Sequence, residues 1–380
     1  MGLFNRISSK HSLSQAVSIK LNQKCISQKT LDKLGEKIRS IGNARCQGWP
    51  IKVASTRTST KFNAAASLKN QIVEIGRASE VAGSSHQTPG MGIIKKFLSR
   101  SLVDLAIDHA NEDLKFNRQP GGVTNIADDA LMSAMVDAER KRRPGMELHV
   151  MRNTDELASF VMEKKGPWQG QAVVKMARGS ESNESHFAAI DLRVEEDGSR
   201  FLVVYESAFL QGEESTGSNH GLKSLLDAMR VAGRNKNDAP PRIGFVELAI
   251  QKSPGDCAIF ALSTALASAK QPEVSAGLVE RMKMDGKNLV YFYDKSGARH
   301  ILQKDKKLGV VLPANLHKHA HSLSTLGTLE TTPVNRQRES VASRGERYRV
   351  ERDGRSYSNS VERKRLVYYN RAKEILNEPK

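Results

Sequence analysis

Residues 251–262 of this 380-residue chain have the sequence QKSPGDCAIFAL. Pro254 and Gly255 interrupt the segment before them, and Asp256 is a favoured residue at the start of a helix. The apolar run that follows predicts a buried helix with Cys257 in its first turn. The unpaired N–H groups and the dipole at that end of a helix favour a thiolate, which is the form that acts as a nucleophile. The alternative is that Cys257 is a small apolar residue that opens a core helix.

The rest of the chain alternates between segments with strand periodicity and segments with helix periodicity. Strands are predicted at 146–151, 172–177, 186–194, 200–207, 244–250 and 288–293, with a candidate hairpin partner at 299–303. Helices are predicted at 93–115, 127–142, 219–233, 257–269, 274–284 and 361–376. The helices are segregated from the strands, so we predict an α+β fold in which helices flank a mixed sheet.

The composition argues against several classes of protein. The chain has only three cysteines, Cys25, Cys46 and Cys257, and this sparse, odd number argues against a disulfide scaffold and for a reducing site of action. No apolar run approaches the ~20 residues that span a bilayer, and the N-terminus lacks the apolar core of a secretory signal. Gly2 suggests N-myristoylation, but Arg6 stands where that motif needs Ser or Thr.

The positive charge is concentrated at the two ends of the chain. The net charge of +17 divides into +10 for residues 1–90, +6 for residues 335–380 and +1 for the segment between them. Basic flanks around a neutral core indicate arms that bind an anion or are simply solvated. Aromatic residues make up 5% of the chain and show no base-stacking pattern, so we expect no specific nucleic-acid partner.

A cysteine nucleophile needs a base and an acid that orients the base, and neighbouring predicted strands carry both. His186 opens the first strand and Glu206 ends the second, with EEDGS between the strands. A three-residue loop with Gly198 in the left-handed region pairs residue 195 with residue 199. That register places His186 and Glu206 diagonally on one face, whereas a two-residue Asp-Gly turn would point Glu206 away. The catalytic hypothesis therefore predicts the three-residue loop.

In this hypothesis His186 takes the proton from Cys257 and later returns it, and Glu206 fixes and stabilises the imidazole. Gln251, on the turn that enters the Cys257 helix, donates its amide to the oxyanion together with the Cys257 backbone N–H. Asp191 is an alternative acid, although the three-residue loop turns it away from His186. Each of these residues taken alone also fits a structural or surface role.

These segments resemble a known family. SHFAAIDLR, VVYESA and QKSPGDCAIFAL look like blocks of the YopJ family of bacterial type III effectors. The core of that family resembles the ubiquitin-like-protein cysteine proteases, with the chain order His, acidic residue, Gln, Cys. The resemblance covers roughly 95–325 and includes RRPGMELHVM (142–151) and LPANLHKHAHS (312–322). Ala258 departs from the family, in which many members have Gly after the cysteine, but Ala fits a helix at least as well.

The resemblance implies an acetyltransferase with a His-Glu-Cys triad. Its cysteine would take acetyl from acetyl-CoA as a thioester and pass it to Ser, Thr or Lys of host proteins, with kinases and immune regulators as the expected targets. Inositol hexakisphosphate (IP6), a polyanion of the host cell, would be the activator. Delivery by a type III secretion system is implied as well, with the host cytosol, nucleus or a membrane left open as the site of action.

The resemblance also assigns parts of the chain. Residues 1–90 would be a flexible basic region with the secretion signal, and residues 91–330 the catalytic core. Residues 331–380 would be a basic regulatory segment that packs with part of the N-terminal helices into a helical regulatory lobe.

Further site residues follow from the same resemblance. Lys252 and Ser253, beside the cysteine, are candidates for CoA contact, and Lys318 matches a lysine used for autoacetylation or inositol-phosphate contact. The candidate ligands of IP6 are the basic residues Arg142, Arg143, Lys318, Arg363, Lys364 and Arg365. We predict no metal site at the histidines around Lys318, because no Cys or carboxylate stands at ligand spacing.

Two other functions compete with acetyl transfer. A protease for ubiquitin or a ubiquitin-like modifier would use the same triad. A non-enzymatic adaptor would bind anionic membrane or nucleic acid through its basic flanks, with a strong dependence on salt.

Overall fold

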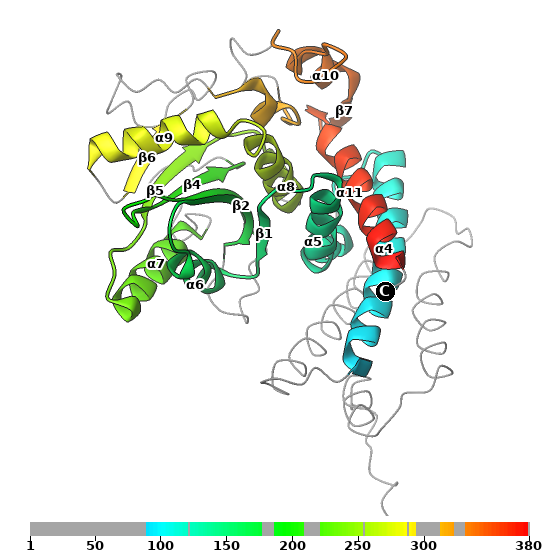
Figure 1. The fold of residues 1–380 in the computed structure, drawn as a ribbon. Helices are drawn as coiled ribbons and strands as arrows, with labels where there is room; N and C mark the ends of the chain where they lie inside the picture. Colours follow the sequence, from blue (N-terminus) through cyan, green and yellow to red (C-terminus); the bar gives the residue numbers. More distant parts are fainter. Residues whose placement is uncertain are drawn as a thin grey trace, which may run out of the picture.

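The computed structural model describes residues 89–120, 122–176, 186–208, 221–253, 255–286, 289–293, 312–322 and 331–378 (Figure 1). Residues 1–88 of the predicted N-terminal region (1–90) and the candidate hairpin partner at 299–303 lie outside the described residues. No helix in the described part of the chain is long and apolar enough to cross a membrane.

Six strands form one mixed sheet, in the order β1-β2-β3-β4-β5-β6. They are β1 Leu148–Met151, β2 Trp168–Lys175, β3 Phe187–Val194, β4 Arg200–Glu206, β5 Arg242–Glu247 and β6 Leu289–Tyr293. The β2–β3 and β3–β4 pairs are antiparallel, and the β1–β2, β4–β5 and β5–β6 pairs are parallel. Each parallel pair needs a crossover, and the helices between the paired strands provide it.

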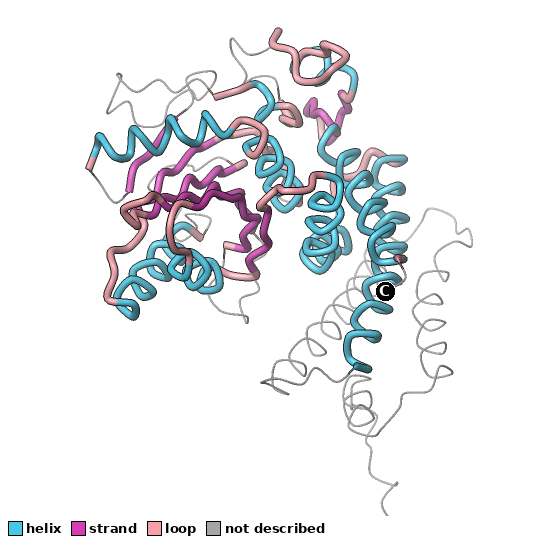
Figure 2. Tube along the Cα trace, viewed as in Figure 1, coloured by secondary structure: helices cyan, strands magenta, loops and turns pink. Residues whose placement is uncertain are grey.

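Helices cover both faces of the sheet (Figures 1 and 2). On one face, α6 (Thr154–Glu163) and α7 (Leu222–Lys236) pack on a layer that includes Val174, Ile190 and Val204. On the other face, α8 (Cys257–Ser268) packs on β2, β3 and β4, and α9 (Pro272–Asp285) packs on β4 and β5. Ten of the twelve residues of α8 are buried, as expected for a helix that is apolar on all sides.

Three further helices form a bundle beside α8. They are α4 (Pro89–Lys115), α5 (Gly122–Arg142) and the C-terminal α11 (Ser360–Asn377), which lies along α4 in Figure 1. Leu131, Tyr368 and Tyr369 are buried in the same apolar cluster as the residues of α8. Helix α11 contacts α4, α5 and α8, so the C-terminal segment packs directly against the helix that carries Cys257.

The structure adds elements that the periodicity did not predict. Helix α6 begins after Asn153, whose side chain accepts the backbone N–H of Glu156 at 2.8 Å. Near the C-terminus, α10 (Val341–Arg347) precedes a two-stranded hairpin of β7 (Arg349–Arg352) and β8 (Arg355–Ser358). A short 3₁₀ helix (Ala314–His317) precedes His321.

Candidate active site

The β3–β4 hairpin has the register that the catalytic hypothesis requires. Val194 pairs with Arg200, and Glu195 donates its backbone N–H to the carbonyl of Ser199 at 2.9 Å. Gly198 closes this three-residue loop with φ of 82°, in the left-handed region. The predicted loop is therefore confirmed.

This register brings His186 and Glu206 together. Nε2 of His186 lies 2.7 Å from Oε2 of Glu206, and His186 also hydrogen-bonds Cys257. Glu206 is buried, and its other carboxylate oxygen accepts the backbone N–H of Ala208 at 2.8 Å. The structure thus places the three predicted residues in one connected group.

The environment of His186 favours its protonated form. Burial by itself lowers the pKa of this imidazole, but the hydrogen bonds to Cys257 and Glu206 and the charges of these partners outweigh burial. Together they raise the pKa of His186 to about 10. His186 is therefore an imidazolium at neutral pH, and Cys257 faces a positive charge.

Cys257 is the first residue of α8, as predicted, and it is 9% exposed. The predicted N-cap role of Asp256 is right for its position and wrong for its side chain. Asp256 stands at the N-cap position, but among the described residues its side chain accepts no amide hydrogen of α8. Its carboxylate instead contacts Ser253, His321 and Arg365.

The side chain of Gln251, on the segment that leads into α8, makes hydrogen bonds to Ser207 and within its own turn. Its side-chain carbonyl accepts the Ser207 hydroxyl at 2.7 Å, and its amide donates to the carbonyl of Ser253 at 2.6 Å. An amide nitrogen carries two hydrogens, so the predicted oxyanion role depends on the second one.

The alternative acid, Asp191, has other partners. Its carboxylate accepts the hydroxyls of Tyr205, at 3.1 Å, and of Ser268. Burial outweighs these hydrogen bonds and raises the pKa of Asp191. Asp191 therefore belongs to a buried network that includes neither His186 nor Cys257.

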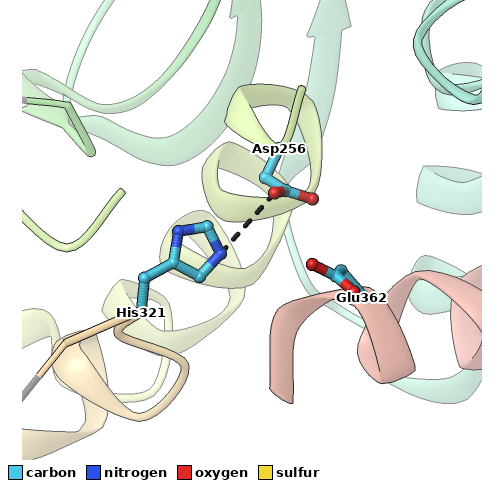
Figure 3. A group of neighbouring side chains, drawn as sticks. All are labelled: Asp256, His321 and Glu362. Carbon is cyan, nitrogen blue, oxygen red and sulfur yellow. Dashed lines mark ion pairs between the residues drawn. The ribbon is translucent and has the colours of Figure 1, made fainter. Parts of the chain in front are cut away.

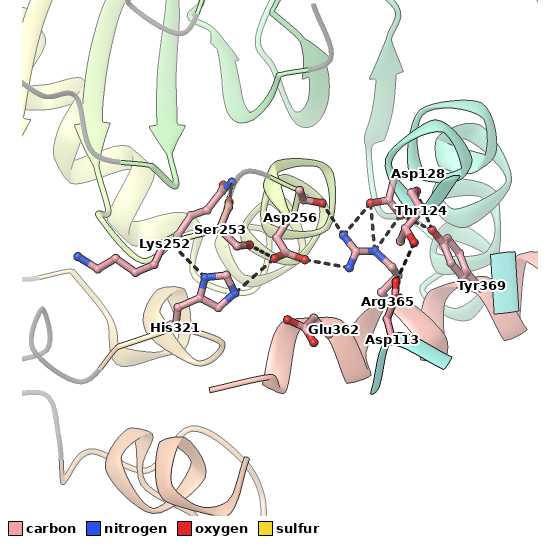
Figure 4. Close-up of polar contacts among 12 residues, drawn as sticks. Asp113, Thr124, Asp128, Lys252, Ser253, Asp256, His321, Glu362, Arg365 and Tyr369 are labelled. Atoms are coloured by element: carbon pink, nitrogen blue, oxygen red, sulfur yellow. Dashed lines mark hydrogen bonds and ion pairs between the residues drawn. The ribbon is translucent and has the colours of Figure 1, made fainter. Parts of the chain in front are cut away.

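The two residues predicted to contact CoA occupy different environments. Lys252 has an exposed side chain, and its backbone N–H donates to Nδ1 of His321 at 2.9 Å. Ser253 is buried, and its hydroxyl donates to Asp256 (Figure 4). Because that hydroxyl is already used inside the turn, Lys252 is the stronger of the two candidates.

Some of the predicted anion ligands converge on one region. Burial and the charges of neighbouring cations lower the pKa of Lys364 to about 8, and burial with Arg344 and Lys270 lowers the pKa of Lys318. We call the side chains linked in this way the basic cluster: Arg143, Lys270, Lys318, Arg344, Lys364 and Arg371. Three of its members, Lys270, Arg344 and Arg371, were not predicted, because they stand in unrelated parts of the sequence.

The other predicted anion ligands lie outside the basic cluster. Arg142 is exposed, and Arg363 is exposed with its Nε donating to Oδ1 of Asn359 at 3.2 Å. The prediction that Arg365 is a ligand of the anion must be corrected. Arg365 is 1% exposed and is fully engaged by Asp128, Asp256 and the carbonyl of Gly255, so its charge is compensated inside the protein.

Three side chains of the types that bind metal ions, including that of Asp256, lie next to one another (Figure 3). Single ligand atoms of Asp256, His321 and Glu362 lie within 4.8 Å of one another. Both carboxylates are already neutralised, since Arg365 pairs with Asp256 and Arg352 binds Glu362 with two nitrogens, at 2.5 and 2.6 Å. A divalent cation would have to displace these arginines, so we interpret the group as an ion-pair network.

Comparison with known proteins gives the family. The model of the YopJ serine/threonine acetyltransferases matches residues 103–371. The chain belongs to this family. A comparison with curated proteins finds no match. The match to the family model includes every residue of the His186, Glu206, Gln251 and Cys257 group.

Solved structures of YopJ-family proteins share the fold of this chain. A structure described as AvrA delL154 with IP6 and CoA has a TM-score of 0.54 and 20% identity, over 74% of this chain and 99% of that chain. HopZ1a in complex with IP6 has a TM-score of 0.52 and 14% identity, over 75% and 99%. HopZ1a with IP6 and CoA gives 0.53 and 16%, over 74% and 98%. The predicted α+β fold, a mixed sheet flanked by helices, is confirmed.

Proposed function

We propose that this YopJ-family protein is an effector acetyltransferase. It would move acetyl from acetyl-CoA through a thioester on Cys257 to Ser, Thr or Lys of host proteins, with IP6 as activator. The observation that carries the proposal is the connected group of Glu206, His186 and Cys257 within the region that matches the family model. Type III delivery into a host cell follows from the family.

In the first half-reaction Cys257 attacks the acetyl carbonyl as a thiolate, stabilised by the His186 imidazolium. When the tetrahedral intermediate collapses, the bond from carbon to the CoA sulfur breaks and His186 gives its proton to that sulfur. The products are CoA and an acetyl thioester on Cys257. The proton that His186 gives to CoA is the one that, in the predicted scheme, it takes from the Cys257 thiol.

In the second half-reaction the neutral His186 acts as a base. It takes a proton from the acceptor hydroxyl or amine as that group attacks the thioester. The bond from carbon to Cys257 Sγ then breaks, which restores the thiolate and the imidazolium. Glu206 stabilises the imidazolium and holds the ring in place at 2.7 Å throughout.

Two groups near Cys257 support the oxyanion in both halves. They are the Cys257 backbone N–H at the start of α8 and the second amide hydrogen of Gln251. The exposed Lys252 is the proposed contact for a CoA phosphate. The structures of AvrA and HopZ1a with CoA support a CoA site in this fold.

The basic cluster is the proposed site for IP6. Its cations come from α5, the turn after α8, the segment around Lys318, α10 and α11. Arg143 and Arg371 already pair with Glu139, and Arg344 pairs with Glu339. The lysines Lys270, Lys318 and Lys364 are therefore the members whose positive charge a bound polyanion would mainly neutralise. The AvrA and HopZ1a complexes with IP6 support a site of this kind. Arg142 and Arg363, both exposed, are proposed as peripheral contacts.

The mass of the intact protein after incubation with acetyl-CoA tests the proposal. We expect added acetyl groups that depend on IP6 and disappear in Cys257→Ala. A variant with Asp191→Asn is the matched control, because this buried carboxyl lies outside the group. No acetylation with or without IP6, together with cleavage of a ubiquitin-type substrate, would instead establish a protease.

A further inference from the structure

Arg365, on the C-terminal helix, contacts the turn that presents Cys257. Its guanidinium donates to the carbonyl of Gly255 at 2.7 Å and lies 2.8 Å from Oδ1 of Asp256. On its other side it binds both carboxylate oxygens of Asp128, on α5, at 2.8 to 3.1 Å (Figure 4). Arg365 thereby joins three elements that are distant in sequence, α5, α11 and the residues just before the nucleophile.

These contacts determine which way the Asp256 carboxylate points. A carboxylate at an N-cap normally accepts the amide hydrogens of the second or third helical residue. Here the carboxylate of Asp256 caps none of the described amides of α8 and is turned instead toward Arg365, Ser253 and His321. The negative charge next to Cys257 is therefore balanced by Arg365 rather than by the first turn of α8.

His321 completes the same turn from the opposite side. Its Nδ1 accepts the backbone N–H of Lys252, so the ring hydrogen is carried by Nε2, which lies 3.5 Å from Asp256. Burial lowers the pKa of His321 to about 4, despite the charge of Asp256, so the ring is neutral. The only full positive charge that touches Asp256 among the described residues is thus the guanidinium of Arg365.

We infer that Arg365 is a positioning residue for the nucleophile. It holds the Asp256 carboxylate away from the first turn of α8 and fixes the Gly255 carbonyl, which leaves the dipole of α8 to act on Cys257 and the oxyanion. The C-terminal helix would then be a structural part of the catalytic centre. This inference rests on the proposed role of Cys257 as the nucleophile.

The test measures the reactivity of the thiol rather than acetyl transfer. Full-length protein is treated with iodoacetamide at neutral pH, and alkylation of Cys257 is followed by peptide mass spectrometry, which separates it from Cys25 and Cys46. We expect Arg365→Gln to slow the alkylation of Cys257 on the order of ten-fold. Lys373→Gln is the matched control, since Lys373 is an exposed cation of the same helix that pairs with Asp104, and it should alkylate at the wild-type rate.

Loss of Arg365 also leaves buried carboxylates unpaired, which destabilises the fold by itself. The double variant Asp128→Asn/Arg365→Gln separates the two effects, because it removes one of those charges. A positioning role predicts that the double variant regains much of the lost melting temperature but not the alkylation rate. Recovery of both together, or wild-type alkylation by folded Arg365→Gln, would overturn the inference.

Two further experimental outcomes also have a definite interpretation. If neither variant folds, Arg365→Lys carries the same comparison, because it keeps the charge but cannot make the planar, multiple contacts of a guanidinium; wild-type alkylation by folded Arg365→Lys would overturn the inference. If wild-type protein forms no acetyl thioester while the alkylation rates behave as expected, the proposed function fails and the positioning role stands.

Discussion

At the scale of single residues, the protonation of His186 is the property of the candidate site that leads to a direct test. The pKa of His186 is raised to about 10, so the folded protein binds the proton of this imidazole more tightly than the unfolded chain does. The resulting stabilisation is fully present below about pH 6.5, the value for an unperturbed histidine, and is lost as the pH rises toward 10.

The first prediction follows from that sign. The melting temperature of wild-type protein should exceed that of His186→Gln by the largest margin near pH 6, and the margin should shrink as the pH approaches 10. Thermal unfolding of both proteins at matched pH values measures the margin. In a Cys257→Ala background the margin should be smaller at every pH, because His186 has lost one partner. A margin that grows with pH would contradict the raised pKa.

The second prediction concerns Glu206. Replacing the carboxylate by an amide in Glu206→Gln keeps the shape of the side chain but removes the charge that stabilises the His186 imidazolium. We expect kcat to fall by at least about 100-fold with little change in KM. Steady-state acetylation of a model peptide would measure both. Asp191→Asn should lower stability but leave kcat per folded molecule close to wild type, and equal losses in the two variants would argue against the assigned acid.

At the scale of elements, the register of the β3–β4 hairpin decides whether the side chains of Glu206 and His186 meet. Gly198 sits at φ of 82° with open space around the position of a Cβ, so only backbone strain opposes another residue there. The third prediction is that Gly198→Val destabilises the protein by about 1–2 kcal/mol, whereas Gly198→Asn costs much less. Chemical denaturation of both variants would measure the difference. Equal stability would show that the loop can change its conformation without strain.

The hairpin also shows what sequence could supply. Two local facts, the period of two in a strand and the conformational freedom of Gly198, left two registers open. The choice between them came from the catalytic hypothesis, which needs His186 and Glu206 on one face. The partners of Asp256 could not be found that way, because Arg365 stands 109 residues later and its guanidinium meets Asp256 only through tertiary packing. Helix α6 did have local signals that the prediction left unused: the cap at Asn153 followed by two acidic residues, and Leu157 and Val161 at helical spacing.

At the scale of the whole molecule, the basic cluster and the turn before Cys257 are far apart in the sequence, but helix α11 contributes a residue to both. The basic cluster gathers cations that the sequence distributes over more than 200 residues, and α11 contributes both Lys364 to that cluster and Arg365 to the turn before Cys257. Occupation of the cluster by a polyanion would therefore act on the same helix that holds the nucleophile turn. Helix α11, in the segment predicted to be regulatory, also packs on α4 and α5, which lie within the predicted core range.

The fourth prediction uses the titration of Lys364. Burial, with the positive charges of Arg371, Lys318 and Arg143, lowers the pKa of Lys364 to about 8 in the absence of a ligand. An anion bound beside it favours the charged form, so binding of IP6 should take up a proton near pH 8, and the affinity should fall as the pH rises from 7 to 9. Calorimetric titrations in buffers with different ionisation enthalpies measure the proton uptake directly.

Lys364→Arg provides the matched control, because arginine stays charged through this range and occupies a similar volume. IP6 titrates too, and its contribution is the same for both proteins, so the difference between them isolates Lys364. We expect the arginine variant to bind IP6 with a weaker dependence on pH and with less proton uptake near pH 8 than wild type. The same uptake in both proteins would place the ligand away from Lys364, and would remove the link between the anion and the helix that carries Arg365.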